Sequence, residues 1–138
     1  MANVHKPDEN MRADSAFVHA TLNSTSSSTI ALATYYPMTN YDLAWYLVHI
    51  HTNAGLAGSI SAQMHQRVGA AGGTAVLKAA QVITAVGVNY ALFARGEDFT
   101  ATYTHIGIRC TEGNGSAVAI SAVLVRMRAR YKQATMLA

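Results

Sequence analysis

Three histidines have the residue type and spacing that come closest to a chemical site. His49 and His51 are two residues apart, so a β-strand would carry both imidazoles on one face, and His65 falls on the next expected strand. Three imidazoles can bind a zinc or nickel ion. However, no carboxylate or cysteine lies near them in the sequence. We therefore expect no functional metal and no cofactor, and predict that these histidines border a loop or a contact between subunits, where their ring nitrogens form hydrogen bonds.

The positive charge of the chain is concentrated near its C-terminus. Over residues 1–125, six lysines and arginines face seven acids, whereas residues 126–138 carry four cations and no acid. On a continuous strand, these cations would line one face about 6–7 Å apart. We expect this strip to dock on an acidic protein surface. A solvated strand edge is the second interpretation, and a nucleic-acid site the third, because Tyr131 would lie on the opposite face. The cations are Arg126, Arg128, Arg130 and Lys132.

Aromatic residues cluster between residues 35 and 46. Such a cluster can be a platform on which sugars stack, or an interface patch, but core and rim aromatics of a β-domain are the favoured interpretation. The cluster consists of Tyr35, Tyr36, Tyr41, Trp45 and Tyr46. Of these, Tyr35, Tyr36 and Trp45 join the basic strip as candidate partner-binding residues.

Catalytic patterns find little support. The close acidic pairs Asp8-Glu9 and Glu97-Asp98 fall in an expected arm and an expected turn, where carboxylates are usually solvated. The sequence has no Gly-x-Ser-x-Gly elbow and no phosphate-binding glycine loop. The single cysteine, Cys110, is expected to point inward with Ile106 and Ile108 as a small buried hydrophobe. We therefore predict a structural or binding protein without enzymatic activity.

The alternation of apolar and polar residues predicts an all-β domain over residues 29–138, preceded by an extended polar arm over residues 1–28. Residues 59–68 give the clearest period-two pattern. About seven strands with glycine-bearing turns favour an antiparallel β-sandwich or a jelly-roll-like barrel. The expected strands are 29–36, 42–52, 59–68, 74–84, 88–95, 100–111 and 116–131.

Low charge and one unusual strand both indicate assembly. Only 12% of the residues are charged and 51% are hydrophobic, whereas a typical soluble domain carries about twice that charged fraction. Residues 117–125 are apolar or small on both faces, and a strand of that kind is usually covered on both faces. An antiparallel sandwich normally leaves one face wet, so this strand predicts a contact between subunits.

Several features together resemble small virion proteins of tailed bacteriophages, particularly capsid decoration (cement) proteins. They are the polar arm Met1–Ser28, the Ala/Gly/Thr/Val-rich strands of Ala75–Ala94, the phrase Asn89-Tyr90-Ala91-Leu92-Phe93-Ala94-Arg95-Gly96, the low charge and the lack of catalytic residues. The resemblance implies a β-rich homo-oligomer, with a trimer favoured, that locks onto the major capsid protein or other virion subunits. It also implies that the arm reaches onto neighbouring subunits and that the basic strip meets an acidic capsid surface.

The expected function is therefore stabilisation of a phage head through contacts between subunits. Other virion roles, in a minor capsid, head-fibre, tail or neck protein, remain open, as does a carbohydrate-binding β-sandwich. The expected location is the virion, after synthesis in the host cytoplasm. The lone cysteine and the polar N-terminal region, which lacks a signal-peptide core, favour that origin. No membrane partner is expected and nucleic acid is the least favoured partner.

Overall fold

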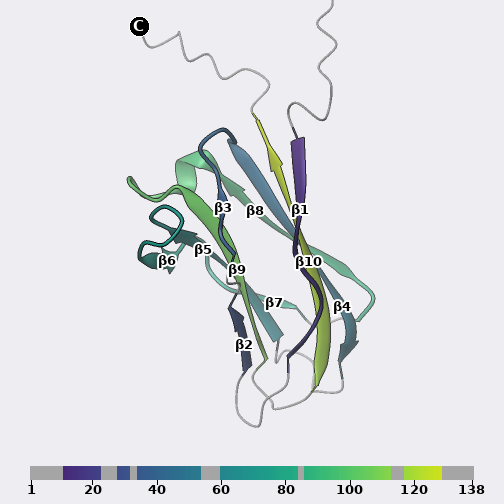
Figure 1. Ribbon diagram of the computed structural model, residues 1–138. Coiled ribbons are helices and arrows are strands. Elements are labelled where there is room, and N and C mark those ends of the chain that lie inside the picture. The colour runs from purple at the N-terminus through teal and green to yellow at the C-terminus, as the bar shows by residue number, and fades with distance from the viewer. Residues whose placement is uncertain are drawn as a thin grey trace, which may run out of the picture.

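Alternating apolar residues build a sandwich of two antiparallel sheets (Figure 1). The computed structural model describes residues 11–22, 28–31, 34–53, 60–83, 86–112 and 117–128. None of the described segments is an apolar helix of membrane-spanning length. The described strands are β1 (Met11–Leu22), β2 (Ser28–Ala31), β3 (Tyr36–Pro37), β4 (Leu43–Asn53), β5 (Ile60–Arg67), β6 (Thr74–Val76), β7 (Gln81–Ile83), β8 (Asn89–Arg95), β9 (His105–Glu112) and β10 (Val118–Met127), with one 3₁₀ turn, η1 (Gly96–Asp98).

The strand order is that of a jelly roll. The four-stranded sheet, which we call sheet A, has the order β1-β10-β4-β8. The other sheet, sheet B, has the order β2-β9-β5-β6, with β3 also pairing with β9 and β7 also pairing with β5. The short strands β2 and β3 therefore share one position, and β6 and β7 share another. Counted by position, each sheet has four strands, and the chain crosses between the sheets as in a double-sheet jelly roll. This confirms the predicted all-β antiparallel sandwich.

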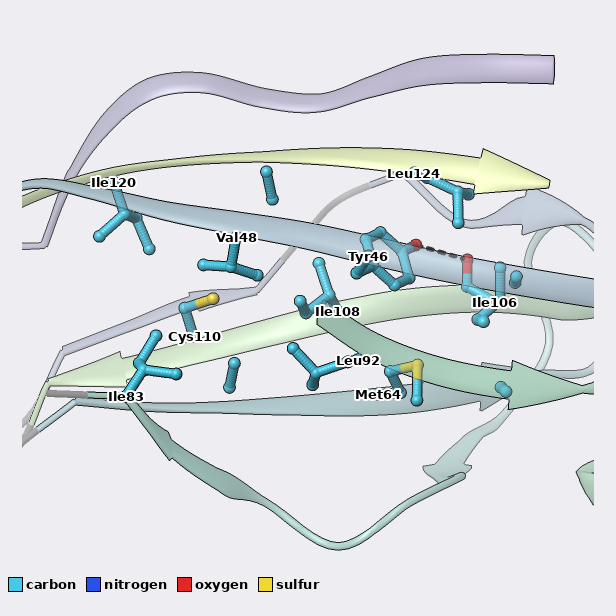
Figure 2. Packing of buried hydrophobic residues seen from close by; sticks show 14 of the residues in the cluster. Tyr46, Val48, Met64, Ile83, Leu92, Ile106, Ile108, Cys110, Ile120 and Leu124 are labelled. Atoms are coloured by element: carbon cyan, nitrogen blue, oxygen red, sulfur yellow. Dashed lines mark hydrogen bonds between the residues drawn. The ribbon is translucent and has the colours of Figure 1, made fainter. Parts of the chain in front are cut away.

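The core lies between the two inner faces (Figure 2). Every second residue of β5 from Ile60 to Gln66 points inward and is buried, as the period-two pattern predicts. Tyr46 of sheet A reaches across the core, and its hydroxyl donates to the carbonyl oxygen of Ile106 in sheet B at 3.4 Å. Cys110 is fully buried as predicted, and burial raises the pKa of its thiol to about 12. The core therefore joins the two sheets mainly through apolar packing.

Three parts of the sequence prediction need correction. The strand predicted over 29–36 is two strands, β2 and β3, which pair with different parts of β9. The polar arm predicted over residues 1–28 does not hold for Met11–Leu22, which is β1 and pairs with β10 from Met11↔Met127 to Leu22↔Val118. Residues 1–10 and 23–27 lie outside the described residues. The strand predicted over 74–84 is two short strands, β6 and β7, each paired to a different part of β5.

Candidate functional site on the outer face of sheet A

The outer face of sheet A carries rows of apolar side chains that run across all four strands. Side chains alternate between the two faces of a strand. Because Ala44, Tyr46 and Val48 of β4 are buried on the inner face, the residues between them point outward. In register, the outward rows are Met11–Met127–Leu43–Arg95, Ala13–Val125–Trp45–Phe93 and Ser15–Val123–Leu47–Ala91. Within these three rows of described residues, Arg95 at one corner is the single charged side chain. We call these rows the apolar face.

Large hydrophobic side chains on the apolar face remain open to solvent. Leu47 is 41% exposed and Val123, its register partner on β10, is 37% exposed. Beside them, the rings of Trp45 and Phe93 pack at 5.1 Å between centroids and are half-buried. Contiguous exposed apolar surface of this kind is typical of an interaction site. The apolar face is therefore the strongest candidate for an interface.

The outer face of β10 shows how far the sequence could identify this surface. The two-sided apolar pattern of residues 117–125 correctly marks β10 as a strand whose outer side is also apolar. It does not identify Leu47 and Phe93, which come from β4 and β8 and reach β10 only through the sheet pairing. Leu43, Trp45 and Leu47 do alternate along the sequence, and that pattern is the signal for the β4 part of the face.

Arg126 is the clearest departure from the predicted basic strip. It points into the sandwich, is 2% exposed, and donates to Asp14 Oδ2 of β1 and to the carbonyl oxygen of Pro37, each at 2.5 Å. Its guanidinium also lies over the rings of Tyr36 and Tyr41, at 5.4 and 4.7 Å from their centroids. Burial of Arg126 is thus compensated by an ion pair and two cation–π contacts.

The four cations therefore do not form one exposed strip. Arg126 is internal, and Arg128 lies at the surface with its guanidinium 6.0 Å from the Tyr41 ring centroid. Arg130 and Lys132 lie outside the described residues. The sequence pattern missed this arrangement because the partner that draws Arg126 inward, Asp14, lies in the segment predicted to be an arm.

The aromatic cluster of the sequence is divided among separate places. Tyr35 covers Gly107 of β9 on sheet B, and the Arg67 guanidinium stacks over its ring at 4.2 Å. The Tyr36 hydroxyl donates to the carbonyl oxygen of Ser15 and so ties β3 to β1. Trp45 alone lies on the apolar face, and Tyr46 is buried in the core. No common sugar-stacking platform forms from Tyr35, Tyr36 and Trp45 in the described structure.

The three histidines separate into a pair and a single residue. His49 and His51 lie together on the outer side of β4, with ring centroids 4.7 Å apart. His65 belongs to sheet B and is 5% exposed, and burial, with a smaller contribution from Arg109, lowers the pKa of its imidazole. No group of three histidines, cysteines or acids close enough to hold a metal occurs among the described residues. A three-histidine site built from these residues is therefore excluded by their placement.

A cavity of about 740 Å³ opens at the end of the sandwich beside η1. Apolar surface predominates in its lining. The aromatic and charged residues around it are Tyr41, Phe93, Phe99 and Tyr103 with Asp42, Arg95 and Glu97. Only Tyr41 of these belongs to the aromatic cluster of the sequence, so the chain fold, and not sequence proximity, gathers the aromatic rings here.

Comparison with known proteins supports the fold. A chain of the infectious bursal disease virus VP2 subviral particle matches with a TM-score of 0.53 and 15% identity, over 86% of this chain and 32% of that chain. Particles of T=1 symmetry derived from the same virus match with a TM-score of 0.51 and 14% identity, over 86% of this chain and 31% of that chain. The structure of the Gt strain of this virus matches with a TM-score of 0.51 and 13% identity, over 88% of this chain and 32% of that chain.

These likenesses show a shared all-β fold. This chain spans about a third of the length of the viral chains that it matches. No protein-family model matches the chain, and no curated protein matches it. The similarity therefore lies in the three-dimensional arrangement of the strands and is not accompanied by a recognisable sequence motif.

Proposed function

We propose that this protein is a non-enzymatic structural subunit of a virus particle and that it assembles through the apolar face of sheet A. The observation that carries the proposal is the continuous set of apolar rows around Leu47 and Val123, which the described chain leaves exposed. The jelly roll is a fold of viral capsid domains, and the viral chains that share this fold come from assembled particles. The low charge of the whole chain also favours association.

Contact between apolar faces would stabilise the assembly by removing hydrocarbon from water. Each square ångström of apolar surface buried contributes about 25 cal/mol. A standard interface buries about 800 Å² on each partner. An isologous contact places the same rows of two copies against each other, so both partners gain from the same side chains. In a particle the small gain of each contact is repeated over many copies.

The narrower proposal is a decoration protein that binds the head of a tailed phage as a homo-oligomer. The sequence resemblance to such proteins supports it, as does a jelly roll with one apolar outer face. The trimer favoured by the sequence resemblance would use a heterologous contact, in which the apolar face of each copy packs against a different patch of its neighbour, in place of the isologous contact. In this proposal the protein resides in the virion after synthesis in the host cytoplasm, and it contacts the major capsid protein. Arg128, with Arg130 and Lys132, supplies the basic side chains that would meet an acidic capsid surface.

The test compares one charge on the apolar face with the same charge elsewhere. Val123→Asp places a carboxylate in the centre of the apolar face, whereas Val82→Asp changes a residue on sheet B that is 58% exposed. We expect light scattering after size exclusion to show a discrete oligomer for the wild type and for Val82→Asp, and a monomer for Val123→Asp. A wild-type monomer at every concentration, or an oligomer that tolerates Val123→Asp, would contradict the proposed interface.

A carbohydrate-binding role is the second candidate, and the cavity beside η1 favours it. Aromatic faces stack on sugar rings, while a carboxylate and a guanidinium bind hydroxyl groups. The cavity combines the rings of Phe93 and Tyr103 with the polar groups of Asp42 and Arg95. The jelly roll is also a fold of lectin domains. In this alternative the protein would recognise an oligosaccharide at the end of the sandwich.

A glycan array distinguishes this candidate from the structural role. Tyr103→Ala removes one wall of the cavity, whereas Val123→Ala changes the apolar face away from the cavity and serves as the control. Glycan binding that is lost in Tyr103→Ala and kept in Val123→Ala would support a sugar site. A wild-type protein that binds no glycan on the array would exclude the glycans tested and leave assembly as the function.

A further inference from the structure

His49 and His51 form a close pair at the end of the apolar face. Their rings are 4.7 Å apart between centroids and meet at 68°. Same-face residues of a regular strand are about 6–7 Å apart. The two imidazoles are therefore drawn closer together than strand spacing alone would place them, and both lie on the outer side of β4.

A β-bulge contributes to this closeness. Ile50 and Thr52 of β4 pair with the consecutive residues Ile120 and Ala119 of β10, so His51 is the extra residue on the bulged strand. A bulge re-aims a side chain and is common beside functional sites. Here the re-aimed side chain is an imidazole, and it lies against a second imidazole.

Strands on both sides hold the two rings in place. His49 Nδ1 lies 2.8 Å from Asn89 Oδ1 on β8, and His51 Nε2 lies 2.9 Å from Ser121 Oγ on β10. Because the amide oxygen of Asn89 can only accept, His49 Nδ1 donates, and the neutral ring carries its lone pair on Nε2. Metal-binding histidines are oriented by hydrogen bonds of this kind, in which the other ring nitrogen donates to a neighbouring oxygen. The hydroxyl of Ser121 can donate or accept, so this hydrogen bond positions the His51 ring in either tautomer.

We propose that His49 and His51 are half of a binding site for zinc or a similar divalent transition metal, and that a second copy of the chain completes it. Imidazole nitrogens are good ligands for these metals, and zinc in a structural site usually has four ligands in a tetrahedron. One chain supplies two. No third metal-binding side chain joins the pair among the described residues, and we assign the remaining ligands to a second copy.

A second copy can supply the missing pair because of where the histidines lie. The row Ser121–His49–Asn89 borders the apolar row of Leu47 and Val123. When two copies pack face to face about a two-fold axis that runs along the strands, each row meets the same row of its partner. The histidine pairs then face each other beside the apolar contact. The inference rests on the proposed function in this respect, because it uses the same face for assembly.

The experiment measures zinc bound to the purified full-length protein and the protein concentration at which the oligomer dissociates. We expect one zinc ion per two chains, and an oligomer that survives dilution at least about tenfold further with zinc than with a chelator. His49→Ala and His51→Ala should each abolish stoichiometric zinc, while the oligomer formed without zinc remains. Asn89→Ala, which removes only the orienting hydrogen bond, should weaken zinc binding by about 10–100-fold. His105→Ala removes an imidazole from sheet B and should leave zinc binding unchanged.

Several results would overturn the shared site. They are a lack of stoichiometric zinc in the wild type, zinc retained in both histidine variants, or one zinc per chain without any change in dissociation. The two proposals can fail separately. An oligomer that is lost in Val123→Asp but binds no zinc would keep the assembly proposal and reject the metal site. A monomer that dimerises only with zinc, through His49 and His51, would keep the metal site and reject an apolar contact as sufficient for assembly.

Discussion

The two outer faces of the sandwich differ sharply although they enclose the same core. On sheet A, the outward side chains of β4 and β10 are mainly apolar: Leu43, Trp45, Leu47, Val123 and Val125. On sheet B, the outward side chains of β5 and β9 are mainly polar: Ser61, Gln63, Arg67, Arg109 and Thr111. Polar side chains are satisfied by water, whereas exposed hydrocarbon gains free energy when it is covered. The contrast makes the outer face of sheet A the better candidate for an interface.

Sheet B also covers its own exposed backbone with side chains from the same chain. Tyr35 lies over Gly107, and Arg67 stacks on Tyr35. His65 Nε2 lies 3.2 Å from Gln63 Oε1 on the same outer side. Sheet A has aromatic packing between Trp45 and Phe93 but keeps exposed aliphatic groups beside it. Sheet B also exposes Val76 and Val82, but these lie on the short strands β6 and β7 and not in rows across the sheet. The apolar face is therefore the stronger candidate for contact with a partner.

The largest expected effect comes from Asp14→Ala, which removes the anchor of β1 at the edge of sheet A. The substitution leaves the Arg126 guanidinium buried without its carboxylate. Breaking a buried ion pair in this way costs about 3–5 kcal/mol. Urea unfolding should show this loss in the free energy of unfolding. Because β1 also contributes Ala13 and Ser15 to the apolar face, the oligomer should weaken with the fold.

The control for Asp14→Ala removes both charges. In Asp14→Ala with Arg126→Met, no unpaired charge stays buried, and replacement of an ion pair by apolar side chains is often neutral. The double variant should therefore be more stable than Asp14→Ala alone. A loss below about 1 kcal/mol in Asp14→Ala would mean that Tyr36, Tyr41 and the carbonyl oxygen of Pro37 suffice to hold Arg126.

A smaller effect is expected from Gly107→Ala on sheet B. A Cβ at this position would lie 2.6 Å from Cε1 of Tyr35, so the ring must shift, which disturbs its stacking with Arg67. Overpacking of this kind costs about 1–3 kcal/mol. Adding Tyr35→Ala should remove most of the penalty in a double-mutant cycle. If Gly107→Ala lowered the free energy of unfolding equally in the wild type and in Tyr35→Ala, the penalty would not come from contact with the Tyr35 ring.

The sequence predicts the inner half of the fold better than its surfaces. Strand β5 could be found because its inward and outward residues alternate between apolar and polar, and β10 because a run that is apolar on both faces is typical of a covered strand. The inward orientation of Cys110 follows from the same rule. β1 could not be found in this way, because its residues Arg12 and Asp14 are charged yet point toward the inner side near Arg126. The ion pair between Asp14 and the distant Arg126 leaves no pattern in the local sequence.

The candidate site depends on pairings that no local pattern specifies. Trp45 and Val125 are distant in the sequence and become neighbours only through the pairing of β4 with β10. The bulge at His51 is likewise a property of two strands together. The sequence did indicate the pair His49 and His51, but not the oxygens of Asn89 and Ser121 that orient the rings. Long-range register therefore determines the parts of the site that sequence reasoning missed.

The third prediction concerns the pH dependence of stability that arises from the buried His65 of sheet B. Burial, and then Arg109, lowers the pKa of His65 below its ordinary value of 6.5 in the folded protein. The unfolded chain therefore binds a proton that the folded protein does not, and stability falls as the pH drops below about 6.5. Each unit by which the pKa is lowered contributes about 1.4 kcal/mol. Unfolding between pH 7 and pH 5 should show a flatter pH dependence in His65→Gln.

His105→Gln is the parallel variant, because burial and two arginines also lower the pKa of His105. Each single variant should remove part of the pH dependence, and the double variant should remove more than either. A slope that is unchanged in His65→Gln would mean that His65 is protonated in the folded protein without loss of packing, and that this side of sheet B is more open to water than its 5% exposure indicates.

The smallest expected effect is the most direct test of the contrast between inner and outer faces. Leu47→Ser changes the apolar face, and Leu124→Ser makes the same substitution in the core, where Leu124 is fully buried. In the Val123→Asp background, which we expect to be monomeric, Leu47→Ser should alter the free energy of unfolding by no more than about 0.5 kcal/mol. Leu124→Ser should cost at least about 3 kcal/mol, because it leaves a cavity and buries a hydroxyl. Similar losses in both variants would show that the apolar face stabilises the single folded chain, and the need for a partner would then disappear.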